Sequence, residues 1–408
     1  MRLHAVGQRS ETVRRANLSA IVRELHLSGA RSRSELVAGT GLTRSAIRGL
    51  IGEFVASGVA TETRATPLGG PGRPSPVVRP NAESATVLAV DILVDSLAVA
   101  LVGLGGEVFD RIRVQPPRGH SAVDEVVDQL AQQAKVLLAR SRSDTVIGIG
   151  VAVAGIVRRS DGFVVMAPNL GWRDVPLGAV LAAALEATVP ISIANDGDLG
   201  ALAELRRGAA IGADDVLYLS GEVGVGGGLI VDGRPLTGVA GFGGEVGHVP
   251  VNPAGIACQC GSIGCWETEI GEEALLRLAG HPTGGGWAEI DAVIEEAEAG
   301  SPVALEAFAS VGRWLGLGLA GLVNIFNPRL VVMGGLFGRI HPYVADALEA
   351  ELTRRALPSS RALVRVVPAR LGVDAPLLGA AELAFEPFLA DPAAWLRPRG
   401  ARAELASA

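Results

Sequence analysis

The segment Gly244–Glu267 constrains this chain of 408 residues more strongly than any other feature. It contains every cysteine of the sequence, together with one histidine, in the spacing His-x9-Cys-x-Cys-x4-Cys. A structural zinc ion takes four tetrahedral thiolate and imidazole ligands from the protein. Buried cysteines also serve as small apolar residues, but their confinement to one short segment favours a metal. The sequence therefore predicts a structural Zn2+ site with the ligands His248, Cys258, Cys260 and Cys265.

The same segment reads Gly-Glu-Val-Gly-His followed by Cys-x-Cys-Gly-x-x-Gly-Cys-x-Glu, which resembles the signature of the ROK family. That family contains bacterial sugar kinases and sugar-responsive transcriptional repressors. The resemblance implies that zinc holds the loop in shape while carboxylate, amide and imidazole groups bind sugar hydroxyls, which both donate and accept hydrogen bonds. His248 would bind zinc with one ring nitrogen and the sugar with the other. The implied sugar-binding residues are Asn169, Asn195, Asp196, Glu245, His248 and Glu267.

The charge of the chain is distributed unevenly between its two ends. A net charge of −7 argues against nucleic acid as a partner. Residues 1–80, however, contain 12 arginines and five glutamates without a lysine or an aspartate, whereas the remainder has 24 basic and 38 acidic residues. The N-terminal part is therefore suited to a polyanion and the rest is not.

Residues 17–57 have the pattern of a helix-turn-helix. Apolar residues recur at helical spacing over 17–29, Ser-Arg-Ser-Glu at 32–35 fits a capping box, and Thr43 can cap a third helix over 44–57. This third helix would read the major groove of DNA. A solvated helix face is the alternative for any single arginine on it. The predicted DNA-contacting residues of this helix are Thr43, Arg44, Ser45 and Arg48.

Two short apolar segments, 59–63 and 76–78, flank a Gly/Pro-rich turn at 69–74 and predict the hairpin wing of a winged helix-turn-helix. Arg73 at the tip of this turn is a candidate for the minor groove, where narrow A·T-rich segments attract arginine. We therefore expect a winged helix-turn-helix DNA-binding domain over 1–80.

The rest of the chain alternates apolar strand-like and helical segments, which is typical of α/β domains. One of the expected strands is continuous over 145–157. The ROK resemblance implies an actin-like (ribonuclease H-like) α/β fold with two lobes and a cleft between them. We expect lobe 1 over 81–195, with a C-terminal helix at about 376–390 returning to it, and lobe 2 with the zinc loop over 196–375. No run of 18 apolar residues or secretion signal occurs, so we expect a cytoplasmic protein without a membrane partner.

The phosphate-binding elements of the family's kinases are altered in this chain. Those kinases use an early Asp-x-Gly-Gly-Thr loop, a second Gly-rich loop and an Asn-Asp pair whose aspartate acts as general base. Here 91–96 reads Asp-Ile-Leu-Val-Asp-Ser, and Glu222 and Val223 replace a glycine and a hydroxyl residue of the second loop. Added carboxylates disfavour a nearby triphosphate. The diglycine at 334–335 fits either the family's adenosine-side motif or close packing. Asp196 is equivalent to the kinase base, but no catalytic residue is predicted.

These features together predict a sugar-responsive transcriptional regulator, most simply a repressor that a monosaccharide or derivative releases from double-stranded operator DNA. Near-palindromic operators require symmetry, so we expect a homodimer or homotetramer. One alternative is an ATP-dependent sugar kinase with an appended DNA-binding domain. Another is a regulator whose trigger is a phosphotransfer-system protein rather than a sugar.

Overall fold

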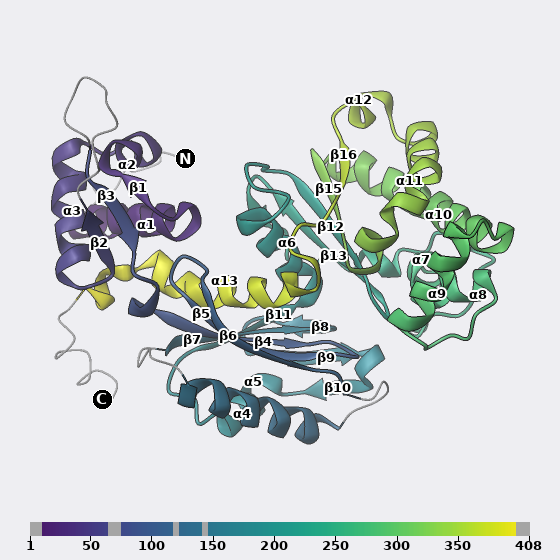
Figure 1. Ribbon diagram of the computed structural model, residues 1–408, viewed down its shortest axis with the longest axis horizontal. Coiled ribbons are helices and arrows are strands. Elements are labelled where there is room, and N and C mark those ends of the chain that lie inside the picture. The colour runs from purple at the N-terminus through teal and green to yellow at the C-terminus, as the bar shows by residue number, and fades with distance from the viewer. Residues whose placement is uncertain (1–9, 64–74, 117–121, 141–145, 397–408) are drawn as a thin grey trace, which may run out of the picture.

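The computed structural model describes residues 10–63, 75–116, 122–140 and 146–396. Figure 1 shows a small N-terminal domain in purple beside two α/β lobes, and the long C-terminal helix α13 (Ala375–Ala390) in yellow runs from the N-terminal domain to the space between the lobes. The architecture is therefore the expected winged helix-turn-helix joined to a two-lobed, actin-like α/β unit.

The N-terminal domain follows its predicted start and stop signals. Ser32 and Glu35 form the capping box of the second helix, and Gly41 ends that helix with a φ of 69°. Thr43 caps the third helix by accepting a hydrogen bond of 3.2 Å from the Ala46 amide. The three-stranded sheet has the order β1-β3-β2. Its elements are α1 (Ser10–Ser28), β1 (Arg31–Ser32), α2 (Arg33–Thr40), α3 (Arg44–Ala56), β2 (Ala60–Thr63) and β3 (Val77–Pro80).

Lobe 1 contains a five-stranded sheet of order β11-β7-β4-β5-β6, in which β4, β7 and β11 are parallel. Helices α4 and α5 lie on one side of this sheet and α13 on the other (Figure 1). Its elements are η1 (Ala82–Ser84), β4 (Thr86–Ile92), β5 (Leu97–Gly103), β6 (Val108–Val114), α4 (Val123–Arg140), β7 (Val146–Val153), α5 (Leu177–Ala184) and β11 (Ile191–Asn195).

The prediction of one continuous strand over 145–157 is wrong, because strand β7 ends at Val153 and a separate strand, β8, begins at Ile156. A Cβ added to Gly155 would lie 2.6 Å from the Ala167 Cβ, so close packing of backbone at this point permits only glycine. After it, the chain leaves the large sheet and forms a small antiparallel sheet of order β10-β9-β8. The elements of this region are β8 (Ile156–Arg158), β9 (Phe163–Ala167), η2 (Pro168–Leu170) and β10 (Trp172–Val175).

Lobe 2 contains a second five-stranded sheet, of order β14-β13-β12-β15-β16, with a helical layer that packs against it. The strands are β12 (Val216–Gly221), β13 (Val225–Val231), β14 (Arg234–Pro235), β15 (Leu330–Gly334) and β16 (Arg365–Pro368). The helices are α7 (Glu267–Ile270), α8 (Glu272–Ala279), α9 (Trp287–Glu298), α10 (Pro302–Phe326), α11 (Gly335–Arg355) and α12 (Pro358–Arg361), with short η3 (Val246–His248) and η4 (Gly372–Asp374). The short η5 (Pro392–Trp395) follows α13 and contacts α1 of the N-terminal domain.

Helix α10 is the one helix, within the part of the chain that the structure describes, whose length and composition would allow it to cross a membrane. It packs against α8, α9 and α11, and 56% of its most apolar window is buried inside the molecule. Its apolar surface therefore contributes to the core of lobe 2, which contains buried Phe308, Leu315 and Leu319.

Helix α6 (Asp196–Arg207) joins the two lobes together with α13. It contacts α13, which covers β4 and β7 of lobe 1, and it also contacts β12 and β13 of lobe 2. The apolar core around α13 continues into the N-terminal domain, where Leu18 and Ile21 of α1 belong to the same buried cluster as Phe385. The N-terminal domain thus lies on the helices that connect the lobes.

Candidate ligand cleft and metal centre

One cavity between the lobes brings together all six residues that the sequence predicts for sugar binding. Its volume is about 80 Å³. Among its described lining residues there are four carboxylates and one imidazole but no lysine or arginine. The polar residues that line it are Asn169, Asn195, Asp196, Ser220, Glu222, Glu245, His248 and Glu267.

Asn195 and Asp196 reach the cavity because β11 ends there and α6 begins. The Asn195 side-chain Oδ1 caps α6 by accepting hydrogen bonds from the backbone amides of Gly197 at 2.8 Å and Asp198 at 3.2 Å. Its Nδ2 donates to the Gly155 carbonyl at 3.1 Å. One Nδ2 hydrogen is then left for a ligand, so Asn195 acts mainly as a cap, and Asp196 offers the freer polar group.

Glu267, at the start of α7, is held by the Gly-rich turn between β12 and β13. Its Oε2 accepts a hydrogen bond of 2.8 Å from the Val225 amide. A Cβ on Gly224 would lie 2.6 Å from this Oε2 and 2.7 Å from the Asn169 Nδ2. The turn therefore passes directly between Asn169 and Glu267, and glycine at this position lets both side chains face the same space.

The four predicted metal ligands lie together, with all of their ligand atoms within 4.8 Å of one another. His248 Nδ1 is 3.7 Å from the Cys258 Sγ, and the Cys260 and Cys265 sulfurs are 3.6 Å apart. Ligands about 2.3 Å from a tetrahedral zinc ion are about 3.8 Å from each other. The three sulfurs and one nitrogen therefore fit zinc in both chemistry and spacing.

Tight turns shape this ligand set. Gly264 has a φ of 66°, and a Cβ on it would lie 1.6 Å from the Asn252 carbonyl oxygen. Gly261 has a φ of 95°. Both positions therefore need glycine to bring Cys265 back beside Cys258 and Cys260.

The cleft holds its carboxyl groups in an environment that disfavours their charge. Burial raises the pKa of Asp196 to about 6. Burial and then the neighbouring Asp196, Asp198 and Glu267 raise the pKa of Glu245 to about 7. Glu222, which is surrounded by Asp91, Asp95 and Asp196, has its pKa raised well above its ordinary value, again chiefly by burial. Protonated carboxyls of this kind can donate as well as accept hydrogen bonds.

Asp198, near the start of α6, is a further buried carboxyl group beside the cleft that was not among the predicted site residues. It is 4% exposed, and its carboxylate oxygens have no hydrogen-bond partner among the residues described. Burial raises its pKa to about 7, although Arg159 opposes the shift. Its position two residues after Asp196 in the Asn-Asp-Gly-Asp sequence was the available signal.

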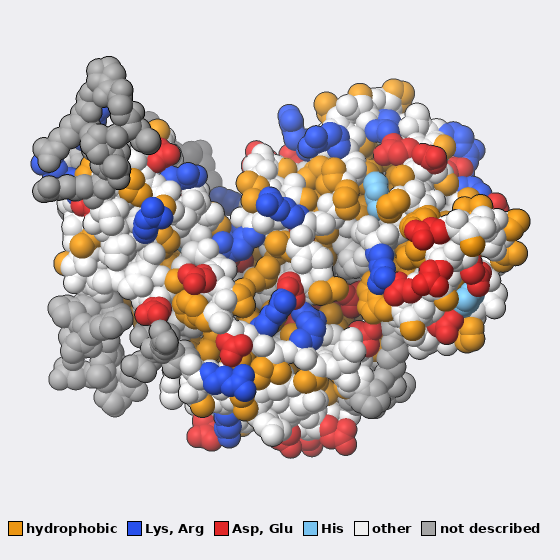
Figure 2. Space-filling view, viewed as in Figure 1, with side chains coloured by type: hydrophobic (Ala, Val, Ile, Leu, Met, Phe, Trp, Pro, Cys, Tyr) orange, Lys and Arg blue, Asp and Glu red, His pale blue; other side chains and the backbone are white. Residues whose placement is uncertain are grey.

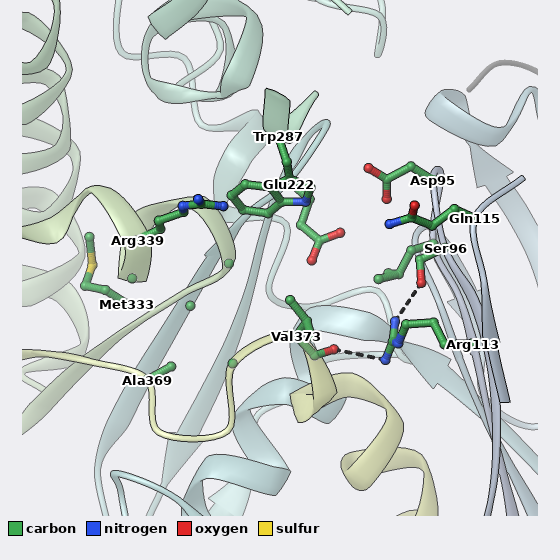
Figure 3. A pocket seen from close by; sticks show the side chains of 15 residues that line it. Asp95, Ser96, Arg113, Gln115, Glu222, Trp287, Met333, Arg339, Ala369 and Val373 are labelled. Carbon is green, nitrogen blue, oxygen red and sulfur yellow. Dashed lines mark hydrogen bonds between the residues drawn. The ribbon is translucent and has the colours of Figure 1, made fainter. Parts of the chain in front are cut away.

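A second cavity of about 440 Å³ adjoins the first, and Glu222 lines both of them. Figure 3 shows Asp95, Ser96, Arg113 and Gln115 on one side and Trp287, Met333 and Arg339 on the other, with Glu222 between them. Gly334 and Gly335 also line it. Trp287 of α9 and Arg339 of α11 were not predicted from the sequence, because their helices carry no recognisable motif.

The basic groups of the second cavity are already paired. Arg113 donates to the Ser96 hydroxyl at 2.6 Å and contacts Asp374 at 3.1 Å. Arg339 forms an ion pair with Asp291 and stacks over the Trp287 ring, with 5.3 Å from guanidinium carbon to ring centroid. A triphosphate would therefore meet Asp95 and Glu222 without an uncommitted cation among these lining residues.

The predicted DNA-contacting residues of α3 are all exposed, whereas Ile47, Leu50, Ile51 and Phe54 are buried beneath them. The exposed set comprises Thr43, Arg44, Ser45 and Arg48. Arg73 lies outside the described residues. On the face shown in Figure 2, arginine side chains lie on the N-terminal domain, and the two lobes show both basic and acidic side chains.

The ROK family sequence profile matches residues 87–386, which is most of the chain. The chain belongs to the ROK family. This match covers both lobes and includes the cysteine-rich loop, and the fold expected from the ROK resemblance is confirmed.

Two relatives extend over the N-terminal domain as well as the lobes. A xylose repressor of Bacillus spizizenii is 28% identical over 378 residues, which cover 92% of this chain and 97% of the repressor. The crystal structure of a ROK family transcriptional regulator, described as a homologue of the E. coli MLC protein, is 26% identical with a TM-score of 0.76 and covers 93% of this chain and 97% of that one. A match of this extent includes most of the winged helix-turn-helix.

A kinase relative matches the lobes alone. The ROK family glucokinase from Streptomyces griseus, solved with glucose and AMPPNP, is 30% identical with a TM-score of 0.64. The alignment covers 73% of this chain and 99% of the glucokinase. The part of this chain that has no counterpart there equals about the length of its DNA-binding domain and its flanking residues.

Proposed function

We propose that this chain is a sugar-responsive transcriptional repressor, released from operator DNA by an unphosphorylated monosaccharide in the cleft. The observation that carries the proposal is the cavity lined by Asn169, Asp196, Glu245, His248 and Glu267, in which no described lining residue is a lysine or arginine. A phosphorylated sugar would bring negative charge among carboxyls without compensation. The extent of the similarity to xylose repressors supports the same conclusion.

The DNA-binding part of the proposal rests on α3. Its N-terminal residues Thr43, Arg44, Ser45 and Arg48 are exposed on one helix face, as the reading helix of a helix-turn-helix requires. Arg73 of the wing is proposed as a minor-groove contact on sequence grounds alone. A symmetric operator would be bound by a homodimer or homotetramer.

The metal part of the proposal is structural zinc held by His248, Cys258, Cys260 and Cys265. Bound zinc would fix the loop that positions His248 and Glu267 beside the cavity. Because His248 Nδ1 faces Cys258, its Nε2 is the ring nitrogen we assign to the sugar. Thiolate ligands of this kind persist in a reducing cytoplasm, where we place the protein.

An ATP-dependent sugar kinase is the second candidate. Three observations favour it. Asp196 lies in the cleft with a pKa of about 6, and a second cavity adjoins the cleft. ROK glucokinases are also among the relatives of this chain. The carboxyl groups of Asp95 and Glu222 weigh against it, because both line the second cavity, Glu222 lines the first as well, and both would face the phosphates. We therefore assign Asp196 to hydrogen bonding with the sugar rather than to catalysis.

The deciding experiment is calorimetric titration of the zinc-loaded protein with D-xylose, D-glucose, N-acetyl-D-glucosamine, D-glucose 6-phosphate and, separately, Mg-ATP. We expect one neutral sugar to bind, and that sugar to release the protein from a DNA duplex selected from a random library. Mg-ATP binding with sugar-dependent turnover, lost in Asp196→Asn, would instead establish the kinase. DNA release by a phosphotransfer-system protein but by none of the sugars would show that a protein is the trigger.

A further inference from the structure

Helix α6 connects the ligand cleft to the DNA-binding domain. Its N-terminus, capped by Asn195, places Asp196 in the cleft. Its last two residues, Arg206 and Arg207, belong to a buried ion cluster with α13 and α1. The helix has 12 residues, so these two ends are about 17 Å apart.

The buried cluster joins three elements through Glu382 of α13. His26 at the end of α1 is 0% exposed, and its Nδ1 accepts from the Gly105 amide at 3.0 Å. Its Nε2 lies 3.1 Å from the Glu382 Oε2 and 2.8 Å from the Arg207 Nη2. Arg207 donates to the same carboxylate through Nε and to the Gly105 carbonyl through Nη1 at 2.9 Å.

Arg206 extends the cluster toward the rest of α1. It donates to Glu382 at 3.0 Å and forms an ion pair with Glu386, which in turn pairs with Arg23 of α1 at 2.9 Å. Although burial alone raises the pKa of Glu382, His26, Arg207 and Arg206 together hold that pKa well below its ordinary value. The carboxylate is therefore charged, and each of its partners is fixed in direction as well as in distance.

The body of α6 is packed without free space on the sides that face the lobes. A Cβ on Gly197 would lie 2.7 Å from the Gly227 amide nitrogen of β13, and one on Gly200 would lie 2.5 Å from the Tyr218 ring of β12. On the other side, a Cβ on Gly379 of α13 would lie 2.0 Å from the Leu199 carbonyl oxygen. Such contacts make the helix move as a rigid body with its neighbours, because packed interfaces change between discrete arrangements rather than deform.

We propose that α6 transmits occupancy of the cleft to the DNA-binding domain, with Arg206 and Arg207 as the positioning residues that hold α1 on this helix. The inference rests on the proposed function for the identity of its two ligands. A sugar that contacts Asp196 and draws the lobes into a new arrangement shifts α6, and the shift reorients α1 through Glu382 and His26. The DNA-binding domains then leave the arrangement that binds the operator tightly.

The first test measures coupling between sugar and DNA in the full-length, zinc-loaded protein. The probes are D-xylose and D-glucose in the cleft and a duplex selected from a random library. In the wild type, we expect the bound sugar to lower affinity for the duplex by about tenfold or more. In Arg207→Gln, we expect the affinities for the duplex with and without sugar to differ by less than about twofold. The affinity of this variant for sugar in the absence of DNA should change by less than about twofold. Arg207→Lys, which keeps the charge, should retain part of the effect of sugar on the affinity for the duplex.

A matched control distinguishes transmission through α6 from the general effect of removing an ion pair of α1. Arg15 of α1 pairs with Asp391 beyond the end of α13 and does not touch α6. Arg15→Gln should therefore keep the full sugar effect. A lowered thermal midpoint in Arg207→Gln with an unchanged sugar effect would show that the cluster only stabilises the fold, and would overturn the proposal. Absence of any sugar effect in the wild type would instead contradict the proposed function.

A second test requires neither sugar nor DNA. Asp196→Asn alters the cleft end of α6, and hydrogen exchange is followed at Gly105 and in the last turn of α1. We expect exchange there to change by about fivefold. In the Arg207→Gln background the same substitution should change it by less than about twofold. Equal changes in both backgrounds, or none in either, would overturn transmission through α6 whatever ligand the cleft binds.

Discussion

Asp91 is a buried carboxyl group whose ionisation affects the stability of the protein. It is 0% exposed, its carboxylate oxygens have no hydrogen-bond partner among the described residues, and Arg113 lies 3.7 Å away. Burial raises its pKa to about 8. An unfolded carboxyl titrates near a pKa of about 3.9, so the folded state binds more protons between these values, and the free energy of unfolding falls as pH rises from about 4 to about 8.

Asp91→Asn should remove the part of this pH dependence that Asp91 contributes and stabilise the protein at about pH 8 by at least about 1 kcal/mol. Thermal unfolding of both proteins at about pH 5 and about pH 8 checks the expectation. It fails if the wild type and the variant lose equal stability between the two pH values. Asp110→Asn, on the partly exposed strand β6, is the control and should leave the pH dependence unchanged.

A substitution at Cys260 tests the predicted zinc site. Cys260→Ser removes one of four zinc ligands, so zinc content, thermal midpoint and sugar affinity should fall together, because metal binding supplies folding free energy to the loop that positions His248. Metal analysis, thermal unfolding and titration measure the three effects. Gln259→Ala, an exposed neighbour, should change none of them. Unchanged zinc content in Cys260→Ser would contradict the assignment.

At the scale of elements, the helices were predictable where local signals decide them. The capping box at Ser32 and the cap at Thr43 set α2 and α3, and both were predicted. Helix α1 begins at Ser10, earlier than the expected 17, and two arginines of this added part make tertiary ion pairs, Arg14 with Glu53 and Arg15 with Asp391. The break at Gly155 was missed because only the packing of β9 requires it.

Helix α3 should set both the affinity for DNA and its dependence on salt. Arg48 is exposed on the predicted reading face. If it contacts a phosphate, Arg48→Ala should weaken binding to all sequences and reduce the slope of log K against log salt concentration by about 1. Fluorescence anisotropy at several salt concentrations measures the slope. Arg354→Ala, a comparably exposed arginine at the far end of lobe 2, should bind like the wild type.

Two helix glycines should respond oppositely to alanine. A Cβ on Gly49 of α3 meets nothing within 4 Å, so Gly49→Ala should stabilise the domain by about 0.5–1 kcal/mol. A Cβ on Gly200 of α6 would lie 2.5 Å from the Tyr218 ring, so Gly200→Ala should destabilise the protein by about 1–3 kcal/mol. Thermal unfolding of both variants measures the signs. A stabilised Gly200→Ala would contradict the close packing of α6.

At the scale of the whole molecule, the sequence predicted the composition of the cleft better than its geometry. The cysteine spacing and the Asn-Asp pair located the candidate residues, which the structure places around one cavity. Residues recruited from distant elements, such as Trp287 and Arg339, carry no local signal. The same holds for the cluster of His26, Arg207 and Glu382, since only the tertiary fold brings residues so far apart in sequence together.

The N-terminal domain should unfold together with lobe 1, because they share one apolar core. Ile21 of α1 is 0% exposed in the buried cluster that also contains Val87 of β4 and Phe385 of α13. Ile21→Ala should therefore cost about 2–5 kcal/mol and increase hydrogen exchange of slowly exchanging amides in α1, β4 and β7 in parallel. Val293→Ala, in the separate core of lobe 2, is the matched control and should affect α9 first. Faster exchange confined to α1 in Ile21→Ala would show that the DNA-binding domain unfolds independently, and transmission through a rigid α1–α13 contact would then lose its physical basis.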